Sequence, residues 1–562
     1  MPSQWAMTST PFPNQPPPYE GRNLYDTDTV LRQAVIREGA AYAIGALGAW
    51  GAELGRAETF VLADAANRHP PELRTHDRRG ERIDTVSFHP AWHALMQRAT
   101  SAGEHCAPWD VPGPGSQVAR AAMYFLHAQV ENGTQCPLTM TYASVPLLVR
   151  HADAMPDIAR TWLPRILARD YDPRRLPIAQ KRAALIGMGM TERQGGSDVR
   201  SNTTRAEPAG GGSFRLHGHK WFFSAPQCDA HLVLAQADAG LSCFLLPHFR
   251  ADGARNGVRI NRLKDKLGNR SNASAEVEFD DAEAWLLGEP GRGIATILEM
   301  VQHTRLDCVI GSAGMMRGAF AWALHHATYR IAFGRRLADQ PLMAAVLADL
   351  ALEVEAATVL ALRLARMFDA PADSSDRALA RIATPAAKYW ICKRAPMVAL
   401  ESMEVMGGNG YIEETPLPRF YREAPVNSIW EGSGNVICLD VLRAARREPS
   451  ALDALWDELE QARGGHRDLD HSAEALRSRL RENDEDEAPA RHVAQAIAVL
   501  LSASLLVRHA PAAIGDAYCA TRLRGDAAFA GGAFGGHGIA FDPSLPLRRA
   551  RGDPPPEPAA GT

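Results

Sequence analysis

Cysteine pairs, net positive charge and long apolar runs are all missing from this sequence. Its eight cysteines are scattered and form no Cys-x-x-Cys pair, which argues against a zinc ribbon or redox dithiol and favours a reduced, cytoplasmic setting. The net charge of −4 excludes a global basic field, so any DNA contact would need a local patch. No uncharged apolar run can span a bilayer, and the first residues lack the basic and apolar regions of a signal peptide. We therefore expect no membrane association.

Several familiar cofactor and metal motifs are missing as well. There is no GxGxxG between a strand and a helix, no P-loop and no HExxH pair. His325 and His326 are adjacent in a helical stretch but have no third group at ligand spacing, so we expect no metal. The apolar fraction of 46% and charged fraction of 22% are ordinary for globular domains. A chain of 562 residues suggests three or four of them.

The pattern of apolar residues divides the chain into helical, β-rich and again helical parts. Helical spacing dominates residues 26–68 and, after a polar interruption, residues 90–186. Short β-rich runs between residues 213 and 279 predict a small barrel or sandwich. Long helical runs after residue 293 predict a bundle. The expected fold class is α+β, with a helical domain at 1–186, a β domain at 187–291, a bundle at 292–447 and an extra helical domain at 448–562.

Both ends of the chain are rich in proline. Residues 1–23 predict an extended arm that either wraps a neighbouring subunit or is disordered. Residues 553–557 predict a disordered tail.

One loop between residues 427 and 435 carries an isolated carboxylate. It reads Asn427-Ser-Ile-Trp-Glu-Gly-Ser-Gly-Asn435 and precedes an apolar run, so Ser433 or Asn435 can cap a following helix. A carboxylate just before a helix is expected to stay ionised, because it lies near the positive end of the dipole. Beside an indole, with glycines that let a ligand approach, Glu431 is a candidate general base. On its residues alone, the loop also fits a surface helix start without a catalytic role.

Three ordered motifs resemble the acyl-CoA dehydrogenase flavoprotein family. They are Gly189-Met-Thr-Glu-Arg-Gln-Gly-Gly-Ser-Asp198, the segment that contains Gly407-Gly-Asn-Gly-Tyr411 followed by Glu414, Arg419 and Glu423, and the Trp-Glu-Gly of residues 430–432, where the family usually has Tyr-Glu-Gly. The second motif begins with Glu404, where the family prefers Gln. Residues 190–205, 263–273 and 425–435, with the extra C-terminal segment, are most similar to the alkylation-response, or AidB, branch. The resemblance covers about residues 30–447.

The resemblance implies FAD, held between the β domain and the bundle without a Rossmann fingerprint. It assigns the hydroxyl and glycine positions of the first motif and the strand Lys220-Trp-Phe-Phe-Ser224 to the flavin. It assigns Arg330 and the Gly407-Gly408 element to the FAD of a neighbouring subunit, which implies at least a dimer and, by analogy with the family, a homotetramer. The implied cofactor-binding residues are Met190, Thr191, Gly196, Ser197, Phe222, Phe223, Ser224, Arg330, Gly407, Gly408, Ile429, Trp430, Ser433 and Asn435.

The resemblance also implies the chemistry. Glu431 removes the α-proton of an acyl-CoA thioester while the β-hydride leaves to the flavin. Some members place the base on an earlier helix, near Thr304 and Arg305 of this sequence, but Thr304 is no carboxylate. We therefore expect Glu431 to serve in the α,β-dehydrogenation of a short or branched acyl-CoA.

The branch resemblance implies a second function, double-stranded DNA binding in the alkylation response with a mainly structural flavin. No lysine follows Lys393, so the basic groups of the C-terminal region are arginines. Arg443, Arg446 and Arg447 form a candidate stripe toward DNA phosphates. The same stripe also fits a solvated helix C-terminus that complements its dipole.

Overall fold

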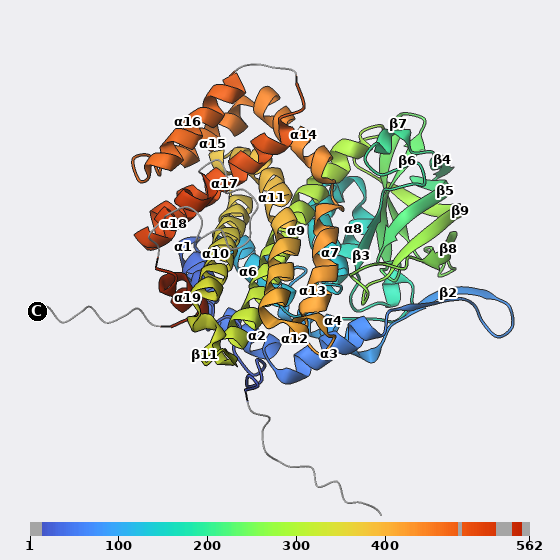
Figure 1. The fold of residues 1–562 in the computed structure, drawn as a ribbon. Helices are drawn as coiled ribbons and strands as arrows, with labels where there is room; N and C mark the ends of the chain where they lie inside the picture. The colour runs from blue at the N-terminus through green and yellow to red at the C-terminus, as the bar shows by residue number, and fades with distance from the viewer. Residues whose placement is uncertain (1–13, 482–485, 524–541, 554–562) are drawn as a thin grey trace, which may run out of the picture.

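The structure, a computed structural model, describes residues 14–481, 486–523 and 542–553. Helices occupy both ends of the chain and a sheet occupies the middle, which confirms the α+β fold class expected from the sequence. In Figure 1 the sheet lies at one side, the longest helices form the centre, and the C-terminal helices α15 (Pro449–Glu460) and α16 (Arg467–Arg481) lie above that centre.

The N-terminal part is helical except for one hairpin. Asp28 caps the first helix by accepting a hydrogen bond from the Leu31 amide at 3.0 Å. The polar interruption expected near residues 70–84 forms an antiparallel hairpin, whose first strand contacts the sheet at β8. The elements are α1 (Thr29–Arg37), α2 (Ile44–Leu54), α3 (Ala57–Arg68), β1 (Glu72–His76), β2 (Arg82–Ser87), α4 (Pro90–Ala102), α5 (Ala107–Asp110), α6 (Ser116–Ala128), α7 (Gln135–Arg150) and α8 (Pro156–Ile166).

Seven strands form the middle domain in the order β3-β5-β4-β6-β7-β9-β8. Additional pairings of β3 with β6 and of β5 with β9 curl the sheet toward closure. Alternate residues of β6 belong to two cores, because Leu232 and Leu234 pack with α7 whereas Val233 and Ala235 pack within the sheet. The strands are β3 (Ile186–Gly189), β4 (Arg205–Gly210), β5 (Ser213–Ser224), β6 (Ala230–Ala237), β7 (Gly240–Pro247), β8 (Val258–Leu263) and β9 (Ser274–Leu287).

A long, almost fully buried helix, α9 (Gly293–Tyr329), is the axis of the bundle. It packs against α6, α7, α10 and α11 and also touches β7 of the sheet. A helix of 37 residues is about 55 Å long, so α9 links the sheet to the far end of the molecule. The other elements are α10 (Pro341–Asp369), α11 (Ser375–Met406), α12 (Gly408–Tyr411), α13 (Leu417–Glu423) and α14 (Gly434–Arg447), with the hairpin β10 (Ile331–Ala332) and β11 (Arg335–Arg336) after α9.

The extra C-terminal helices pack on the bundle through buried apolar and charged groups. Arg522 donates to Asp349 at 2.6 Å and to Glu353 at 3.0 Å, both on α10, and all three side chains are buried. A buried guanidinium paired in this way anchors the segment and is unavailable to DNA. The helices are α15 (Pro449–Glu460), α16 (Arg467–Arg481), α17 (Ala490–His509), α18 (Ala512–Arg522) and α19 (Ser544–Arg551).

Helix α17 is long and apolar enough to cross a membrane, and within the described ranges it is the one helix that is. Buried residues make up 72% of its apolar window, and the helix packs against α10, α11, α14 and α18. Its composition therefore fits a core helix of this domain.

The described part of the N-terminal arm lies against its own chain. Tyr19 is buried against Trp322 and Phe60. Asn14 exchanges side-chain hydrogen bonds of 2.8 and 2.7 Å with the backbone of Ile331. The arm's first 13 residues and the tail from residue 554 lie outside the described residues.

Candidate active site

The loop that carries Glu431 is fixed by two buried cations from the bundle. Lys388 of α11 donates to the carbonyls of Trp430 at 2.8 Å and Gly432 at 2.7 Å. Arg305 of α9 donates to the Glu431 carbonyl at 3.0 Å. These bonds hold Glu431 at a φ of 58°, in the left-handed region that non-glycine residues seldom adopt. The loop therefore presents this one side chain in a fixed direction.

The Glu431 carboxyl group lies in a mostly dehydrated position. The Thr304 hydroxyl donates to its Oε2 at 2.6 Å. Burial raises the pKa of Glu431, and the Thr304 hydrogen bond and the charges of Lys388 and Arg305 offset only part of that rise. Burial therefore acts against the ionised form that the position before a helix was expected to favour. Ser433 occupies the N-cap position of α14 without donating or accepting a side-chain capping bond.

A cavity of about 40 Å³ opens beside this carboxyl group. The Ser224 end of β5 and the Trp430 indole border it, and its remaining walls come mainly from α6, α7 and α9. Trp430 is oriented by its indole N–H, which donates to Asn427 at 2.9 Å, and Asn427 in turn donates to Ser312 at 3.0 Å. A general base, an aromatic wall and a hydroxyl thus meet in one enclosed space.

The first motif forms the turn after β3, and its geometry fits a flavin. The Thr191 carbonyl accepts from the Trp221 amide at 2.8 Å, which ties the turn to β5. A Cβ on Gly196 would lie 2.3 Å from the Thr191 hydroxyl oxygen, so the close approach requires glycine. Gly196 and Ser197 are exposed, and Phe222 is 49% exposed. The exposed ring of Phe222 lies on the strand to which the turn is tied, and the turn carries exposed amide and hydroxyl donors. This combination suits a flavin ring and its phosphates.

The resemblance assigns Phe223 to the flavin, but the structure places its side chain inside the sheet. Its side chain is fully buried and stacks on His231, with ring centroids 3.8 Å apart, inside the sheet. Successive residues of a strand point to opposite faces, so Phe222 and Ser224 share one face and Phe223 takes the other.

Four functional groups were not predicted from the sequence. Lys388, which no local motif marks, and Asn427, the first residue of the loop motif, position the Glu431 loop. Within the first motif, Glu192 is fully buried and accepts from Lys220 at 2.7 Å and from the Thr203 amide at 2.7 Å. This buried pair holds the motif turn on the sheet. The sequence signal for it was the presence of charged residues in a strand-rich segment, because burial of a charge is costly unless the charge is paired.

Arg330 and the Gly407-Gly408 element lie far from this site within the chain. About seven turns of α9 separate Thr304 from Arg330, roughly 39 Å, and about five turns of α11 separate Lys388 from Gly407. Both elements lie at the lower end of the bundle in Figure 1, near β11 and α12. Within one chain these two elements therefore lie far from Glu431, which is compatible with the expectation that they serve a neighbouring subunit.

The remaining loop residues have mixed surroundings. Met190 lies at the turn, where its carbonyl accepts from Asn202 at 2.9 Å. Ile429 is 64% exposed. The Asn435 side chain accepts from Arg491 of α17 at 2.8 Å, so its amide oxygen is engaged by the extra domain.

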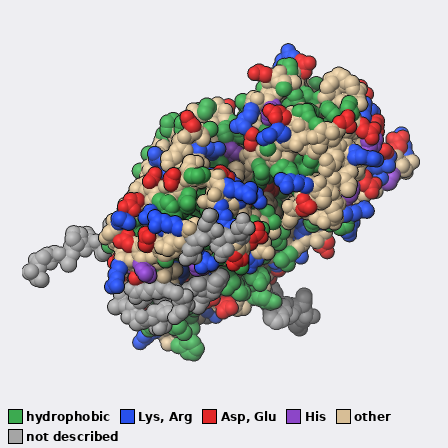
Figure 2. Space-filling model, turned by 90° about the horizontal axis from the view of Figure 1, so that it is seen from above, with side chains coloured by type: hydrophobic (Ala, Val, Ile, Leu, Met, Phe, Trp, Pro, Cys, Tyr) green, Lys and Arg blue, Asp and Glu red, His purple; other side chains and the backbone are tan. Residues whose placement is uncertain are grey.

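The proposed DNA stripe lies at the exposed C-terminal end of α14. Arg443, Arg446 and Arg447 are all exposed, but Arg443 lies 3.9 Å from Asp440 and Arg446 donates to the Asp486 carbonyl at 2.9 Å. Figure 2, which views the molecule from above Figure 1, shows basic and acidic side chains interspersed on that face. The face visible in Figure 2 has no broad patch of one sign.

Comparison with known proteins accounts for most of the chain. Residues 14–173 match the N-terminal domain of the adaptive response protein AidB. Residues 187–282 match the middle domain of acyl-CoA dehydrogenases, and residues 291–445 match their C-terminal domain.

Individual relatives agree with these domain matches. The putative acyl-CoA dehydrogenase AidB of Escherichia coli (strain K12) is 50% identical over 517 residues, which are 92% of this chain and 94% of that protein. Acyl-CoA dehydrogenase family member 11 of Caenorhabditis elegans is 31% identical over 490 residues, which are 81% of this chain and 78% of that protein. The crystal structure of C. elegans ACDH-11 in complex with C11-CoA has a TM-score of 0.81 at 27% identity, and the match covers 96% of this chain and 93% of that chain.

The matched domains establish the class of this protein, an FAD-dependent oxidoreductase with the acyl-CoA dehydrogenase fold. Its N-terminal domain and its 50% identical relative are both of the AidB type. The chain therefore belongs to the AidB branch of the acyl-CoA dehydrogenase family, and the resemblance inferred from its motifs is confirmed.

Thr304→Val tests how the protonation of Glu431 is set. The Thr304 hydrogen bond stabilises the carboxylate and lowers its pKa, so its removal should raise the already raised pKa of Glu431 further. A base acts only when deprotonated, so the acid limb of the pH profile for dehydrogenation should move to higher pH. A bond to a charged group is worth about 1.5–3 kcal/mol, which corresponds to a shift of about one to two pH units.

Stopped-flow reduction of the flavin over a pH series measures this shift. Thr304→Ser keeps the hydroxyl and should leave the limb in place. An acid limb that is the same in the parent and in Thr304→Val contradicts the assigned role of this hydrogen bond.

Proposed function

We propose that the protein catalyses α,β-dehydrogenation of a short or branched acyl-CoA, with Glu431 as the base. The observation that carries the proposal is a single carboxyl group with a raised pKa, held in a cavity beside Ser224 on the flavin-facing strand. A carboxylate is a stronger base where water is excluded, because burial destabilises the charged carboxylate more than the neutral carboxylic acid that forms when it takes a proton.

The residues of the chain divide the work of the reaction. The carboxylate of Glu431 takes the α-proton of the acyl group and becomes a carboxylic acid. When bound, FAD would supply the two-electron acceptor for the hydride that leaves the β-carbon, so that one C–H bond breaks at each carbon and the α,β double bond forms. Thr304 keeps a fraction of the carboxyl ionised, and Lys388 and Arg305 fix the loop so that the base does not swing away. The enclosed walls exclude water from the reacting carbons.

Glu431→Gln tests the assignment of the base. The amide keeps the shape of the side chain and the loop, so FAD content and fold should be unchanged. Flavin reduction by a reactive acyl-CoA should slow by about 10²–10⁴-fold, the usual contribution of a general base. Glu404→Gln, at an exposed position near the end of α11, is the matched control and should react like the parent. Equal rates in the parent and in Glu431→Gln would place the base elsewhere.

A homotetramer built as a dimer of dimers is part of the proposal. The hairpin after α9 supports it, because Phe333 is 99% exposed at the hairpin tip and Ile331 and Leu342 nearby are at least half exposed. Exposed apolar clusters of this kind mark contact surfaces. Arg330 adjoins the hairpin and would meet the phosphates of a neighbour's FAD with a charged, bidentate group.

Phe333→Asp should weaken this assembly and lower the FAD content of the purified protein. Analytical ultracentrifugation and the ratio of flavin to protein absorbance measure both effects. Val61→Asp introduces the same charge at an exposed apolar position on α3, and should change neither. A Phe333→Asp protein with unchanged mass and full flavin content contradicts the proposal.

A reducing, cytoplasmic location is likewise proposed. It is supported by the eight cysteines, all of which are buried free thiols. Thiols without partners persist where the surroundings keep them reduced.

Double-stranded DNA binding is the second candidate, and the mixed charges around α14 weigh against it. If Arg443, Arg446 and Arg447 meet phosphates, neutralising all three should weaken binding. It should also flatten the dependence of log K on log salt by about one unit for each phosphate that is no longer bound. Fluorescence anisotropy with duplex DNA at several salt concentrations measures this slope. Coinciding curves for the parent and the triple variant would remove this surface from any DNA role.

A further inference from the structure

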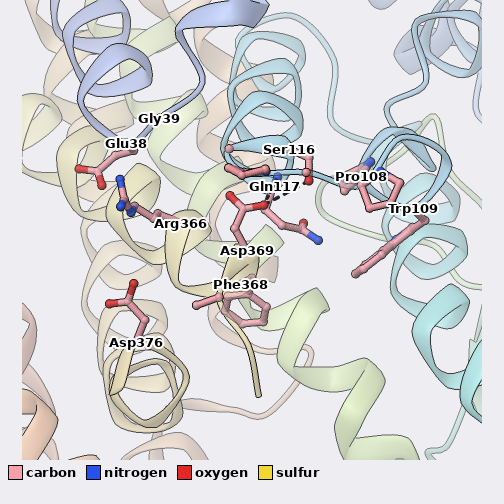
Figure 3. A pocket seen from close by; sticks show the side chains of 15 residues that line it. Glu38, Gly39, Pro108, Trp109, Ser116, Gln117, Arg366, Phe368, Asp369 and Asp376 are labelled. Atoms are coloured by element: carbon pink, nitrogen blue, oxygen red, sulfur yellow. Dashed lines mark hydrogen bonds between the residues drawn. The ribbon is translucent and has the colours of Figure 1, made fainter. Parts of the chain in front are cut away.

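A second, larger cavity lies near the cavity at Glu431. It has a volume of about 530 Å³ and is formed by the end of α1, the residues around α5 and the start of α6, and the end of α10 (Figure 3). Asp369 of α10 crosses its floor, accepting from the Gln117 amide at 2.8 Å and from the Ser116 hydroxyl at 3.2 Å. The rings of Trp109 and Phe368 supply its apolar surface.

A layer of buried side chains separates the two cavities. Gln117 borders the large cavity and accepts a hydrogen bond from the Tyr142 hydroxyl of α7. Asp307 borders the small cavity and pairs with Arg120, whose guanidinium lies over the Tyr142 ring, 3.8 Å from its centroid. A path from one cavity to the other thus crosses Gln117, Tyr142, Arg120 and Asp307, all less than 5% exposed.

Helix α9 contributes to both faces of this layer. His303, one turn before Asp307, makes edge-on ring contacts with Tyr142, Trp109 and Phe368 at centroid distances of 5.4, 5.4 and 5.0 Å. Burial lowers the pKa of His303 to about 3, so its ring is neutral and packs as an aromatic group. Tyr142 therefore lies at the centre of the layer, between α9 and the segment at Trp109.

The small cavity limits the acyl group on the opposite side as well. A Cβ added to Gly311 of α9 would lie 3.3 Å from the Tyr124 ring, which is closer than an ordinary van der Waals contact. The glycine leaves room for the ring, and the cavity, bounded by that ring and the polar layer, holds only a few carbon atoms beyond the reacting centre.

We propose that the two cavities are chambers of one potential acyl channel, and that Tyr142 is the specificity-determining residue that closes it. In the parent protein the acyl group then ends at the Tyr142 layer, which restricts the substrate to short chains. Removal of the ring joins the chambers and lets a longer chain run past α9 toward Trp109 and Phe368. This inference rests on the proposed dehydrogenation at Glu431.

Tyr142→Ala is the direct test, with FAD-loaded full-length protein and straight-chain acyl-CoAs of four, eight and twelve carbons. The ratio of kcat/KM for the eight-carbon to the four-carbon substrate should rise about ten-fold or more, since a few added methylenes gain a place to bind. Tyr142→Phe keeps the ring and removes the hydroxyl, and should keep the parent's preference. An FAD-loaded Tyr142→Ala protein with the parent's ratio overturns the proposal.

Gly311→Ala gives a separate answer if Tyr142→Ala does not fold. The added methyl group enters the small chamber, so the preference should move toward the three-carbon substrate, by about ten-fold relative to the four-carbon one. An unchanged preference in this variant would mean that the acyl end does not lie in the small chamber. Because the channel depends on that position, this result overturns the proposal. If no acyl-CoA reduces the parent's flavin, the proposed function is wrong, and the channel proposal, which depends on it, is wrong as well. A parent that reacts but variants that do not shift would remove the channel alone.

Discussion

The Lys388 ammonium group, which binds the carbonyls on both sides of Glu431, is the interaction on which the rest of this site depends. The loop has few contacts of its own that could hold a glutamate in the left-handed region, and the strain of that conformation must be offset by tertiary bonds. Lys388 comes from α11 and Arg305 from α9, so the base is placed by the packing of the two longest helices. Any change that shifts one helix along the other moves the carboxyl group relative to the sheet.

Helix α9 supplies the site with different groups on successive faces. Thr304 reaches the carboxyl group, Arg305 the loop backbone, and His303 and Asp307 the layer between the cavities. Residues one position apart on a helix point about 100° apart, whereas those four apart share a face. One helix thus links the pKa of Glu431, the position of its loop and the depth of the acyl cavity. A substitution at one of these helix positions is expected to disturb all three properties.

The extra C-terminal helices illustrate how charge can be read wrongly from composition. Their arginines look available for phosphate in the sequence, yet Arg522 is buried against α10, and Arg508 shares the buried Glu458 with Arg363 of α10. Buried pairs of this kind fix one packing arrangement, because removal of a single partner leaves an unpaired charge in a dry interface. The helices cover α10 and α11, and so stabilise the part of the bundle from which Lys388 projects.

The sequence by itself determined the order of helical, β and helical parts, and it singled out the turn around Thr191 and Gly196 and the carboxylate of Glu431 as candidates, because each is carried by local periodicity or by a contiguous motif. Only the tertiary structure decided that Phe222 and not Phe223 faces outward, since the phase of a strand depends on what covers each face. It also decided the direction in which the pKa of Glu431 moves, because its hydrogen-bond donor and the cations that fix its loop are distant in the chain, and burial is a property of the assembled helices. The layer at Tyr142 likewise exists only where α6, α7 and α9 meet, and no spacing along one segment predicts a contact among three.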